Sequence, residues 1–147
     1  MLGRLYENQD CSAARTLEIV GERWSLLILR DAMFRNYVRF SDFQRSLGIA
    51  TNILAKRLDS FVENGLMIRQ GDDDPGEPRE YHLTEKGLAL MPVIIALTEW
   101  GDQWAQPGPV EFRHATSGAR IELRLMDTVK DITVRPDQIR AIRRQKV

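Results

Sequence analysis

Apolar residues recur every three or four positions through the first part of the chain, which is the spacing of amphipathic helices. This pattern predicts helices over residues 13–20, 22–34, 42–47 and 51–64. Within residues 24–34 the apolar positions cover more than one face, and one stripe runs from Trp24 through Ile28 to Asp31. Because a helix that is apolar nearly all round leaves no face for water, we expect this one to be buried on both sides.

Two of the predicted helices are neighbours separated by the turn Gly48-Ile49-Ala50. Ser41 is a good N-cap for the helix 42–47, and Thr51 is the N-cap or a first-turn residue of the helix 51–64. A helical wheel separates an inner face of the second helix from an outer one. The inner face holds Leu54, Leu58 and Phe61, and the outer face holds Asn52, Ala55, Lys56 and Asp59.

The next segments predict a β-hairpin and a longer helix. Residues 66–70 and 79–83 have strand character, and the acidic, turn-rich loop 71–78 separates them. Thr84 is placed to cap a helix in which Pro92 predicts a kink, because proline removes a backbone hydrogen bond. An apolar stripe on that helix holds Val93, Leu97, Trp100 and Trp104. One small domain would not leave this much apolar surface in water, so we expect a partner subunit.

From residue 107 the pattern changes. Apolar and polar residues alternate over residues 110–114, 119–126 and 131–134. Because alternation is typical of half-exposed strands, we expect a domain over residues 11–106 followed by a small β-rich extension over residues 107–147. The extension ends in a basic tail, helical or without regular structure, that holds Arg140, Arg143, Arg144 and Lys146.

The order of these elements predicts a fold class that is mainly α with a small β-hairpin wing (α+β). Helices, then a hairpin, then a further helix is the order of a winged helix-turn-helix. In that fold the second of two neighbouring short helices enters the major groove of DNA. Side chains on the outer face of the helix 51–64 would then reach base edges or phosphates. We therefore expect double-stranded DNA as a partner.

The distribution of charge agrees with this expectation, although the total does not. The chain has 21 Lys plus Arg and 21 Asp plus Glu, a net charge of zero that excludes a generally basic, histone-like protein. Between residues 35 and 57 the only acid is Asp42. The bases there are Arg35, Arg39, Arg45, Lys56 and Arg57. This local excess is typical of a surface that faces phosphates.

The chain offers little for catalysis or for a metal. Its single cysteine, Cys11, cannot complete a structural zinc site with His82 and His114. No nucleophile motif or carboxylate pair is present, so we expect no enzyme, no catalytic residue, no metal and no cofactor. The first ten residues lack the hydrophobic run of a signal peptide, and the apolar stretch 88–97 is too short to cross a bilayer. We expect a cytoplasmic protein with no membrane partner.

Several motifs stand in a recognisable order: Gly21-Glu22-Arg23-Trp24-Ser25-Leu26-Leu27, Arg39-Phe40-Ser41-Asp42-Phe43, Glu63-Asn64-Gly65-Leu66, Tyr81-His82-Leu83-Thr84-Glu85-Lys86-Gly87 and Glu99-Trp100-Gly101. With these motifs the chain resembles the HxlR-type winged-helix regulators, relatives of the MarR group, over about residues 11–101. The resemblance implies a homodimeric bacterial transcription regulator that dimerises through its N-terminal and C-terminal helices. It also implies a palindromic or pseudo-palindromic operator.

Two features depart from the pattern of that family. Asp72, Asp73 and Asp74 crowd the tip of the wing, where carboxylates would repel phosphates, so we expect no deep insertion of the wing into the minor groove. Some longer relatives carry a cysteine-containing extension that resembles a metal-binding ribbon. The extension of this chain has Ser117 and no cysteine, so we expect no metal there.

The candidate DNA-contacting residues are Arg39, Ser41, Thr51, Asn52, Ala55, Lys56, Arg57 and Arg79. Each has a plainer alternative. Residues 52 and 55–57 could form only a solvated helix face, and Ser41 and Thr51 could serve only as helix caps. Arg39 and Ser41 lie where the N–H groups at a helix start favour phosphates. Arg79 fills the basic position beside the second strand of the wing.

Cys11 is a possible sensor, because related regulators sense electrophiles or oxidants through a cysteine at this position. A thiolate near Arg15 would be favoured by its charge and would be reactive. The alternative is a small, buried and inert cysteine. Three aromatic residues also have two interpretations, either as the lining of an effector pocket or as packing in the core or a dimer interface: Trp24, Trp100 and Trp104.

Together these expectations predict a homodimeric DNA-binding repressor that responds to a small molecule or to a redox signal. The alternative is a winged-helix module for protein interaction with weak or no DNA binding, because the total charge is zero and the wing is acidic. The two differ in their response to salt. Operator binding weakens steeply as salt rises, since counterions are released from DNA.

Overall fold

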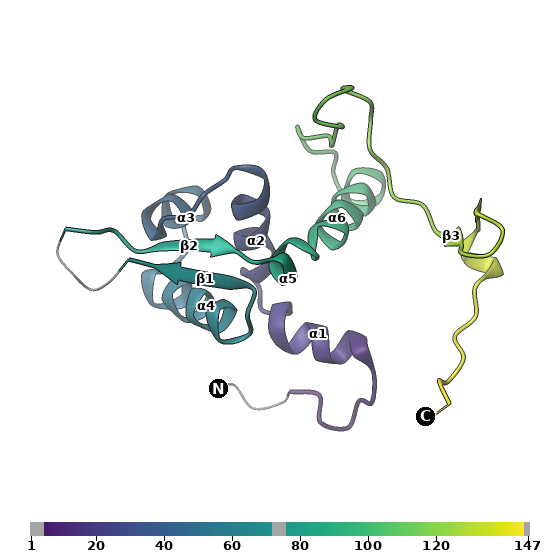
Figure 1. Cartoon of the computed structure of the whole chain (residues 1–147), viewed down its shortest axis with the longest axis horizontal. Coiled ribbons are helices and arrows are strands. Elements are labelled where there is room, and N and C mark those ends of the chain that lie inside the picture. Colours follow the sequence, from purple (N-terminus) through teal and green to yellow (C-terminus); the bar gives the residue numbers. More distant parts are fainter. Residues whose placement is uncertain (1–4, 72–75, 146–147) are drawn as a thin grey trace. The chain divides into compact units, whose positions relative to one another are not determined.

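The computed structural model describes residues 5–71 and 76–145, and its helices and strands follow the predicted order (Figure 1). The helices are α1 (Ser12–Val20), α2 (Ser25–Phe34), α3 (Phe40–Leu47), α4 (Thr51–Glu63), α5 (Glu85–Leu88) and α6 (Met91–Trp104). The strands are β1 (Met67–Gln70), β2 (Glu80–Leu83), β3 (Met126–Asp127) and β4 (Ile132–Thr133), and a short 3₁₀ helix, η1, covers Pro136–Gln138. The chain divides into two compact units, Met1–Ile94 and Ile95–Val147, and each is described by itself.

The ends of α3 and α4 are set largely as the sequence predicts. Gly48 ends α3 with a φ of 62°, and Gly65 follows the C-cap of α4 with a φ of 74°, both in the left-handed region that favours glycine. Thr51 is the first residue of α4, one of its two expected positions. The cap predicted at Ser41 is wrong, because α3 begins at Phe40, two residues before the predicted start, and Arg39 is its N-cap. Ser41 lies instead in the first turn.

The kink predicted at Pro92 is replaced by a break before it. Thr84 is confirmed as a cap, since its Oγ1 accepts a hydrogen bond from the N–H of Gly87 at 3.1 Å. The helix that it caps, α5, ends at Leu88, and α6 begins at Met91. Pro92 therefore lies in the first turn of α6. The missing N–H costs nothing there, because N–H groups of a first turn have no partner within the helix.

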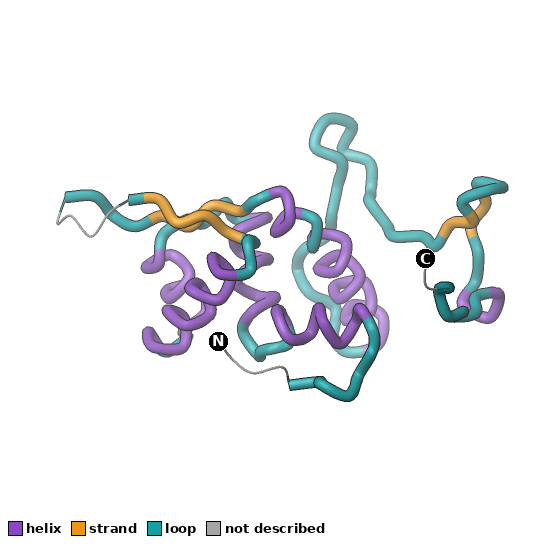
Figure 2. Tube along the Cα trace, turned by 60° about the horizontal axis from the view of Figure 1, so that its bottom comes forward, coloured by secondary structure: helices purple, strands orange, loops and turns teal. Residues whose placement is uncertain are grey.

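β1 and β2 form the predicted antiparallel hairpin, which is the wing (Figure 2). A third segment pairs with it. Arg39 forms a β-bridge with Glu80, and the N–H of Tyr81 donates to the carbonyl of Val38 at 2.7 Å. This pairing, which sequence patterning did not predict, ties the chain before α3 to the first half of β2. The acidic tip predicted at Asp72, Asp73 and Asp74 lies outside the described residues.

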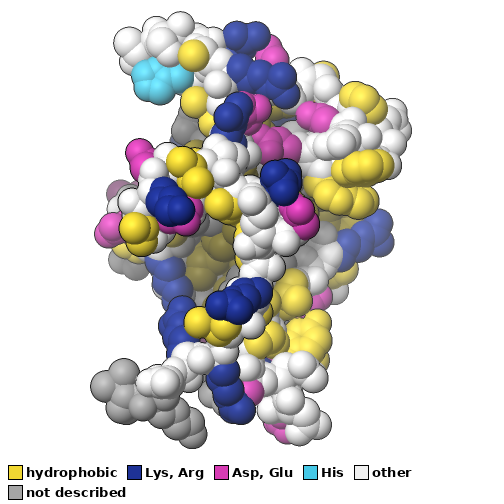
Figure 3. Space-filling view, turned by 90° about the vertical axis from the view of Figure 1, so that its right-hand side faces the viewer, with side chains coloured by type: hydrophobic (Ala, Val, Ile, Leu, Met, Phe, Trp, Pro, Cys, Tyr) yellow, Lys and Arg dark blue, Asp and Glu magenta, His cyan; other side chains and the backbone are white. Residues whose placement is uncertain are grey.

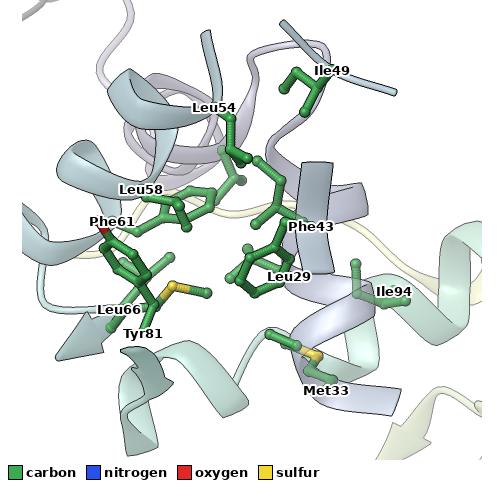
Figure 4. Packing of buried hydrophobic residues seen from close by; sticks show 14 residues of the cluster. Leu29, Met33, Phe43, Ile49, Leu54, Leu58, Phe61, Leu66, Tyr81 and Ile94 are labelled. Carbon is green, nitrogen blue, oxygen red and sulfur yellow. The ribbon is translucent and has the colours of Figure 1, made fainter. Parts of the chain in front are cut away.

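The core of the first unit lies among α2, α3, α4 and the hairpin (Figure 4). The inner face of α4 is confirmed, because its three predicted residues, Leu54, Leu58 and Phe61, are fully buried. Phe43 of α3 is also fully buried, and its ring meets that of Tyr37 edge to face with 6.4 Å between the centroids. The buried residues of α2, which was predicted to be buried on both sides, are Ser25, Ile28, Leu29, Asp31, Ala32 and Met33.

Three hydrogen bonds join the end of α4 to the start of α5, and we call them the α4–α5 junction. Thr84 Oγ1 donates to the carbonyl of Gly65 at 2.6 Å, and the N–H of Thr84 donates to the carbonyl of Leu66 at 3.0 Å. Lys86 Nζ donates to the carbonyl of Asn64 at 2.7 Å. The junction thus gives hydrogen-bond partners to the backbone carbonyls of residues 64–66, which directly follow α4.

The second unit contains most of α6 and the C-terminal extension, residues 107–147. Regular β pairing in the extension is less extensive than predicted. β3 and β4 have two residues each, and the only other pairing among residues 107–145 is an isolated bridge between Arg113 and Arg120. The boundary between the two units falls within α6, between Ile94 and Ile95. That residues 107–147 form a separate domain stays a prediction.

Charged residues of the extension pair with partners two positions along the chain. The ion pairs are Glu111–Arg113 at 2.7 Å, Arg135–Asp137 at 3.0 Å and Glu122–Arg124. The hydrogen bond and the charge of Arg124 lower the pKa of Glu122 below its ordinary value. In the basic tail, Arg140, Arg143 and Arg144 have no regular structure, and Lys146 lies outside the described residues.

Candidate nucleic-acid interface

The outer face of α4 is the first part of the candidate interface. Thr51, Asn52 and Lys56 are exposed, and Ala55 is half-buried. Leu54, on the opposite side of the helix, is fully buried and anchors α4 in the core (Figure 4). Three of these candidates, Asn52, Ala55 and Lys56, therefore lie on the side of α4 that the helical wheel predicts, and Thr51 is exposed at the start of the helix. Their contact with DNA stays a prediction at this point.

The start of α4 is suited to an anion. Its N-cap is Ala50, which has no side-chain oxygen and makes no side-chain cap hydrogen bond. The N–H groups of a first turn point out of the helix, and the helix dipole adds partial positive charge there, so such a start favours phosphate. Thr51 and Asn52 lie in this turn and add a hydroxyl and an amide that can donate to the same anion.

A buried carboxylate fixes α3 against α2. Asp31 is fully buried, its Oδ2 accepts a hydrogen bond from Ser46 Oγ of α3 at 2.6 Å, and its Oδ1 accepts one from Arg30 Nη2 at 2.9 Å. A buried carboxylate is costly unless it is paired and hydrogen bonded, and these contacts meet that need. A hydrogen bond with Tyr37 and the charge of Asp31 raise the pKa of Arg35 above its ordinary value. The sequence placed Asp31 on an inward stripe but did not identify Ser46 as its partner.

The start of α3 and the wing hold three further candidates. Arg39 and Ser41 are exposed at the start of α3, and Arg79 is exposed immediately before β2. The bridge between Arg39 and Glu80 brings these two segments together, although they are far apart in the sequence. The loop end of the wing and the start of α3 therefore present their basic residues from adjoining backbone.

Arg57 differs from the other candidates because it is buried. Its side chain is 11% exposed, and its Nη1 lies 3.6 Å from Glu22 Oε1 in the turn between α1 and α2. Its Nε is buried without a hydrogen-bond partner among the described residues. The alternative that Arg57 belongs to a solvated helix face is wrong. Arg57 lies four positions before the buried Phe61, at the edge of the inner face, where the long aliphatic stem of an arginine can pack beside apolar residues.

Intramolecular pairs reduce the positive charge of residues 35–57. Arg45 Nη2 lies 2.7 Å from Asp42 Oδ1. Arg35 Nε lies 3.7 Å from Oδ1 of the buried Asp31. Arg57 is also paired, so three of the five bases counted in the sequence have an acidic neighbour. Two of those acids come from outside the segment. The local excess of positive charge is therefore smaller than the sequence indicates.

Cys11 is exposed and caps α1. Its Sγ accepts a hydrogen bond from the N–H of Ala14 at 3.3 Å. The part of the alternative that makes Cys11 buried is therefore wrong. The guanidinium of Arg15 lies 3.2 Å from Glu18 and donates to the carbonyl of Gln9 at 3.0 Å. Its charge is thus shared with a carboxylate and not directed at the thiol alone.

The three tryptophans have different surroundings. Trp24 is half-buried against the core of the first unit, whereas Trp100 and Trp104 are 64% and 67% exposed on α6. None of them lines the hollow of about 360 Å³ at the base of the wing. That hollow is lined by Ala32, Met33, Asn36, Tyr37, Val38, Tyr81, His82, Leu83 and Leu88.

Both histidines have local contacts. His82 Nε2 lies 2.8 Å from Glu80 Oε2 on the same strand, and His114 Nδ1 accepts a hydrogen bond from the N–H of Ser117 at 3.1 Å. Within residues 5–71 and 76–145, no three His, Cys, Asp or Glu side chains are grouped so that they could hold a metal ion. Over the same residues, no helix is long and apolar enough to span a bilayer.

Helices α3 and α4 with the β1–β2 wing define the chain as a winged helix-turn-helix protein. The family model described as HxlR-like helix-turn-helix matches residues 19–109. The chain therefore belongs to the HxlR-like helix-turn-helix family and is a DNA-binding transcription regulator.

Known relatives agree with this assignment. An uncharacterised HTH-type transcriptional regulator of Mycobacterium tuberculosis, Rv3095, is 42% identical over 120 residues, which cover 80% of this chain and 75% of the relative. The crystal structure of PA1607, described as a candidate transcription factor, matches at 35% identity with a TM-score of 0.82. The match covers 95% of this chain and 99% of the PA1607 chain. The reduced form of the transcriptional regulator YodB from Bacillus subtilis matches at 30% identity with a TM-score of 0.55 and covers 68% of this chain and 99% of its own.

Proposed function

We propose that this regulator is a cytoplasmic, homodimeric repressor that binds a palindromic or pseudo-palindromic operator, with α4 of each subunit in the major groove. The observation that carries the proposal is the exposed first turn of α4 with Lys56, opposite a fully buried inner face. Hydroxyl, amide and ammonium groups at these positions match the acceptors of base edges and phosphates. The proposed contacts are Arg39, Ser41, Thr51, Asn52, Ala55, Lys56 and Arg79. Arg57 is left out because its side chain is buried.

An exposed apolar stripe on α6 supports the homodimer. Val93, Leu97, Trp100 and Trp104, which we call the α6 stripe, follow one another at helical spacing and are each at least 40% exposed. A soluble monomer rarely keeps a contiguous surface of this kind in water. Two-fold pairing of two copies would cover the stripe and would present two α4 helices to two half-sites.

We also propose that a small molecule or a redox signal releases the repressor from its operator. The hollow at the wing base is the candidate site for the small molecule. Val38 and Tyr81 line it, and the hydrogen bond between them ties the wing to the chain before α3. Cys11 is the candidate site for the redox signal, because its thiol is exposed. The related YodB is described in a reduced form, which supports this choice.

Replacing Lys56 with alanine is expected to weaken DNA binding about tenfold or more, because a dimer loses two cationic contacts. The plot of log K against log salt should also become shallower by about 1.8, at about 0.9 for each phosphate that is no longer neutralised. The measurement is fluorescence anisotropy with a labelled duplex from upstream of the gene or of its neighbour, repeated between about 50 and 200 mM salt.

Lys130→Ala is the matched control for this variant. Lys130 is also exposed and its removal changes the charge equally, but it lies in the C-terminal extension and not on α4. We expect its affinity to stay within about twofold of wild type, as for most surface substitutions. Wild-type affinity in Lys56→Ala would contradict the proposed docking of α4. If the wild type does not bind promoter DNA even at low salt, the alternative of a protein-interaction module is favoured.

Replacing Cys11 with serine is expected to make DNA binding insensitive to diamide and quinones while α1 stays intact. A serine hydroxyl can accept the same hydrogen bond from Ala14, and serine is a good N-cap. Because the chain has one cysteine, oxidation must join two molecules or add a group to the thiol. Anisotropy titrations with and without oxidant compare the two proteins. A wild type that keeps its affinity in diamide, or a variant that loses it, would argue against a sensor at Cys11.

A further inference from the structure

The C-terminal extension is an addition to the family domain. The family model ends at residue 109, and YodB, matched along 99% of its own chain, covers 68% of this one. PA1607 covers 95% of this chain, so its match must continue into the extension. The extension is therefore a defined segment that some members of the family have and others lack.

The extension has no core of its own. None of its described residues, 107–145, is buried. Figure 3 shows hydrophobic side chains at the surface of the face that it views, among charged ones. The large apolar side chains of the extension that are at least half exposed are Val110, Leu125, Val129, Ile132, Ile139 and Ile142. Apolar surface of this extent gains little from internal packing, so its burial has to come from another surface.

Residues 120–125 of the extension have an apolar side and a charged side. The apolar side holds Ile121, Leu123 and Leu125, and the charged side holds Arg120, Glu122 and Arg124. The ion pair between Glu122 and Arg124 joins two residues of the charged side, as alternation requires. Glu122 offsets one of the two arginines, so this side has a net charge of only +1 and a weak attraction for nucleic acid. The apolar side calls for an apolar partner.

Within one chain, the extension and the α6 stripe do not cover each other. The N–H of Leu123 donates to Glu99 Oε1 at 2.9 Å, and the N–H of Gly108 donates to Asp102 Oδ1 at 3.0 Å. These bonds hold the extension at the side of α6 that carries the two acids. Helical spacing places the α6 stripe on the opposite side, where it stays exposed.

We propose that the C-terminal extension is a dimerisation arm whose apolar side packs on the α6 stripe of a second copy of this chain. This inference rests on the proposed homodimer. A second copy is the partner because each chain has both surfaces, an uncovered apolar segment and an uncovered apolar helix face. A two-fold axis lets the two copies use both surfaces at once, so the pairing closes as a dimer.

The test compares two paired substitutions in the full-length chain. Leu123→Ser with Leu125→Ser removes the apolar side and is expected to raise the dimer dissociation constant about tenfold or more, measured by sedimentation equilibrium. Glu122→Gln with Arg124→Gln is the matched control, because it changes the charged side of the same segment and keeps the net charge. We expect it to stay within about twofold of wild type. Circular dichroism should be unchanged in both, since none of the four residues is buried.

A cross-link separates contact between copies from contact within one copy. In a Cys11→Ser background, Leu125→Cys is placed in one tagged chain and Trp100→Cys in a differently tagged chain. Each chain then has a single cysteine, so a disulfide can form only between copies. Mixing and mild oxidation are expected to give a product with both tags. Arg124→Cys in place of Leu125→Cys should give much less of it.

The outcomes distinguish the arm from the proposed function. An unchanged dissociation constant in the leucine variant, or no product with both tags, overturns the arm and leaves operator binding by α4 untouched. A monomeric wild type contradicts the proposed homodimer itself. If the leucine variant loses DNA affinity while its dissociation constant is unchanged, nucleic acid contacts the apolar side and the arm is wrong.

Discussion

Alanine at Phe43 is expected to lower the free energy of unfolding of the first unit by about 3–5 kcal/mol. Phe43 is fully buried, and Figure 4 shows its ring within the cluster that also holds Leu29. Truncation leaves a cavity among α2, α3 and α4 and removes the edge-to-face contact with Tyr37. Domains of this size are stable by only about 5–15 kcal/mol, so the loss is a large fraction of the total. Urea unfolding followed by far-UV circular dichroism measures it.

Phe34→Ala is the control for this variant. The same side chain is removed, but Phe34 is 38% exposed at the end of α2, so much of its apolar surface already meets water. We expect a loss of about 1 kcal/mol or less. If both variants lose the same stability, the core does not centre on α3 as described.

Alanine at Gly87 is expected to destabilise the first unit by about 3 kcal/mol. A Cβ there would lie 2.3 Å from the carbonyl oxygen of Leu66 and 3.0 Å from Cδ2 of Leu83. The first atom belongs to the backbone next to β1 and cannot move aside as a side-chain end can. Relief of the clash would separate α5 from the hairpin and break the hydrogen bond by which Thr84 caps α5. The same urea titration measures the effect.

Gly101→Ala shows whether close approach, and not glycine itself, causes this loss. Gly101 lies in the interior of α6, and a Cβ there would have no neighbour within 4 Å. Because alanine is the better helix former, we expect this variant to gain about 0.5–1 kcal/mol. A gain at Gly87 as well would contradict the described packing of α5 against the hairpin.

The helix pattern of the first unit could be predicted because local and tertiary preferences agree there. Leu54 and Leu58 share a helical face and point into the core, and Gly48 and Gly65 end helices in the left-handed conformation that glycine allows. The exposed side of α4 follows from the same wheel. A pattern of period 3.6 therefore located the candidate interface without any knowledge of contacts.

Contacts between distant residues could not be predicted in this way. The pairing of Arg57 with Glu22 joins residues far apart in the sequence, and the stripe position of Asp31 gave no sign that Ser46 would bond to it. The prediction of strands in the C-terminal extension was inaccurate for a different reason. Alternation indicates one apolar side, but a strand also needs a neighbouring strand to pair with, and most of residues 107–125 have none.

The α4–α5 junction restricts the motions by which a signal could release DNA. Its three hydrogen bonds hold residues 64–66, which directly follow α4, to Thr84 and Lys86 at the start of α5, and α6 begins shortly after α5. Rotating α4 alone would strain these bonds, so we expect α4 and α5 to move together. We therefore expect allosteric release to change the spacing between the two α4 helices of a dimer by rigid-body movement of the subunits. Each α4 would keep its position relative to α5 of its own subunit.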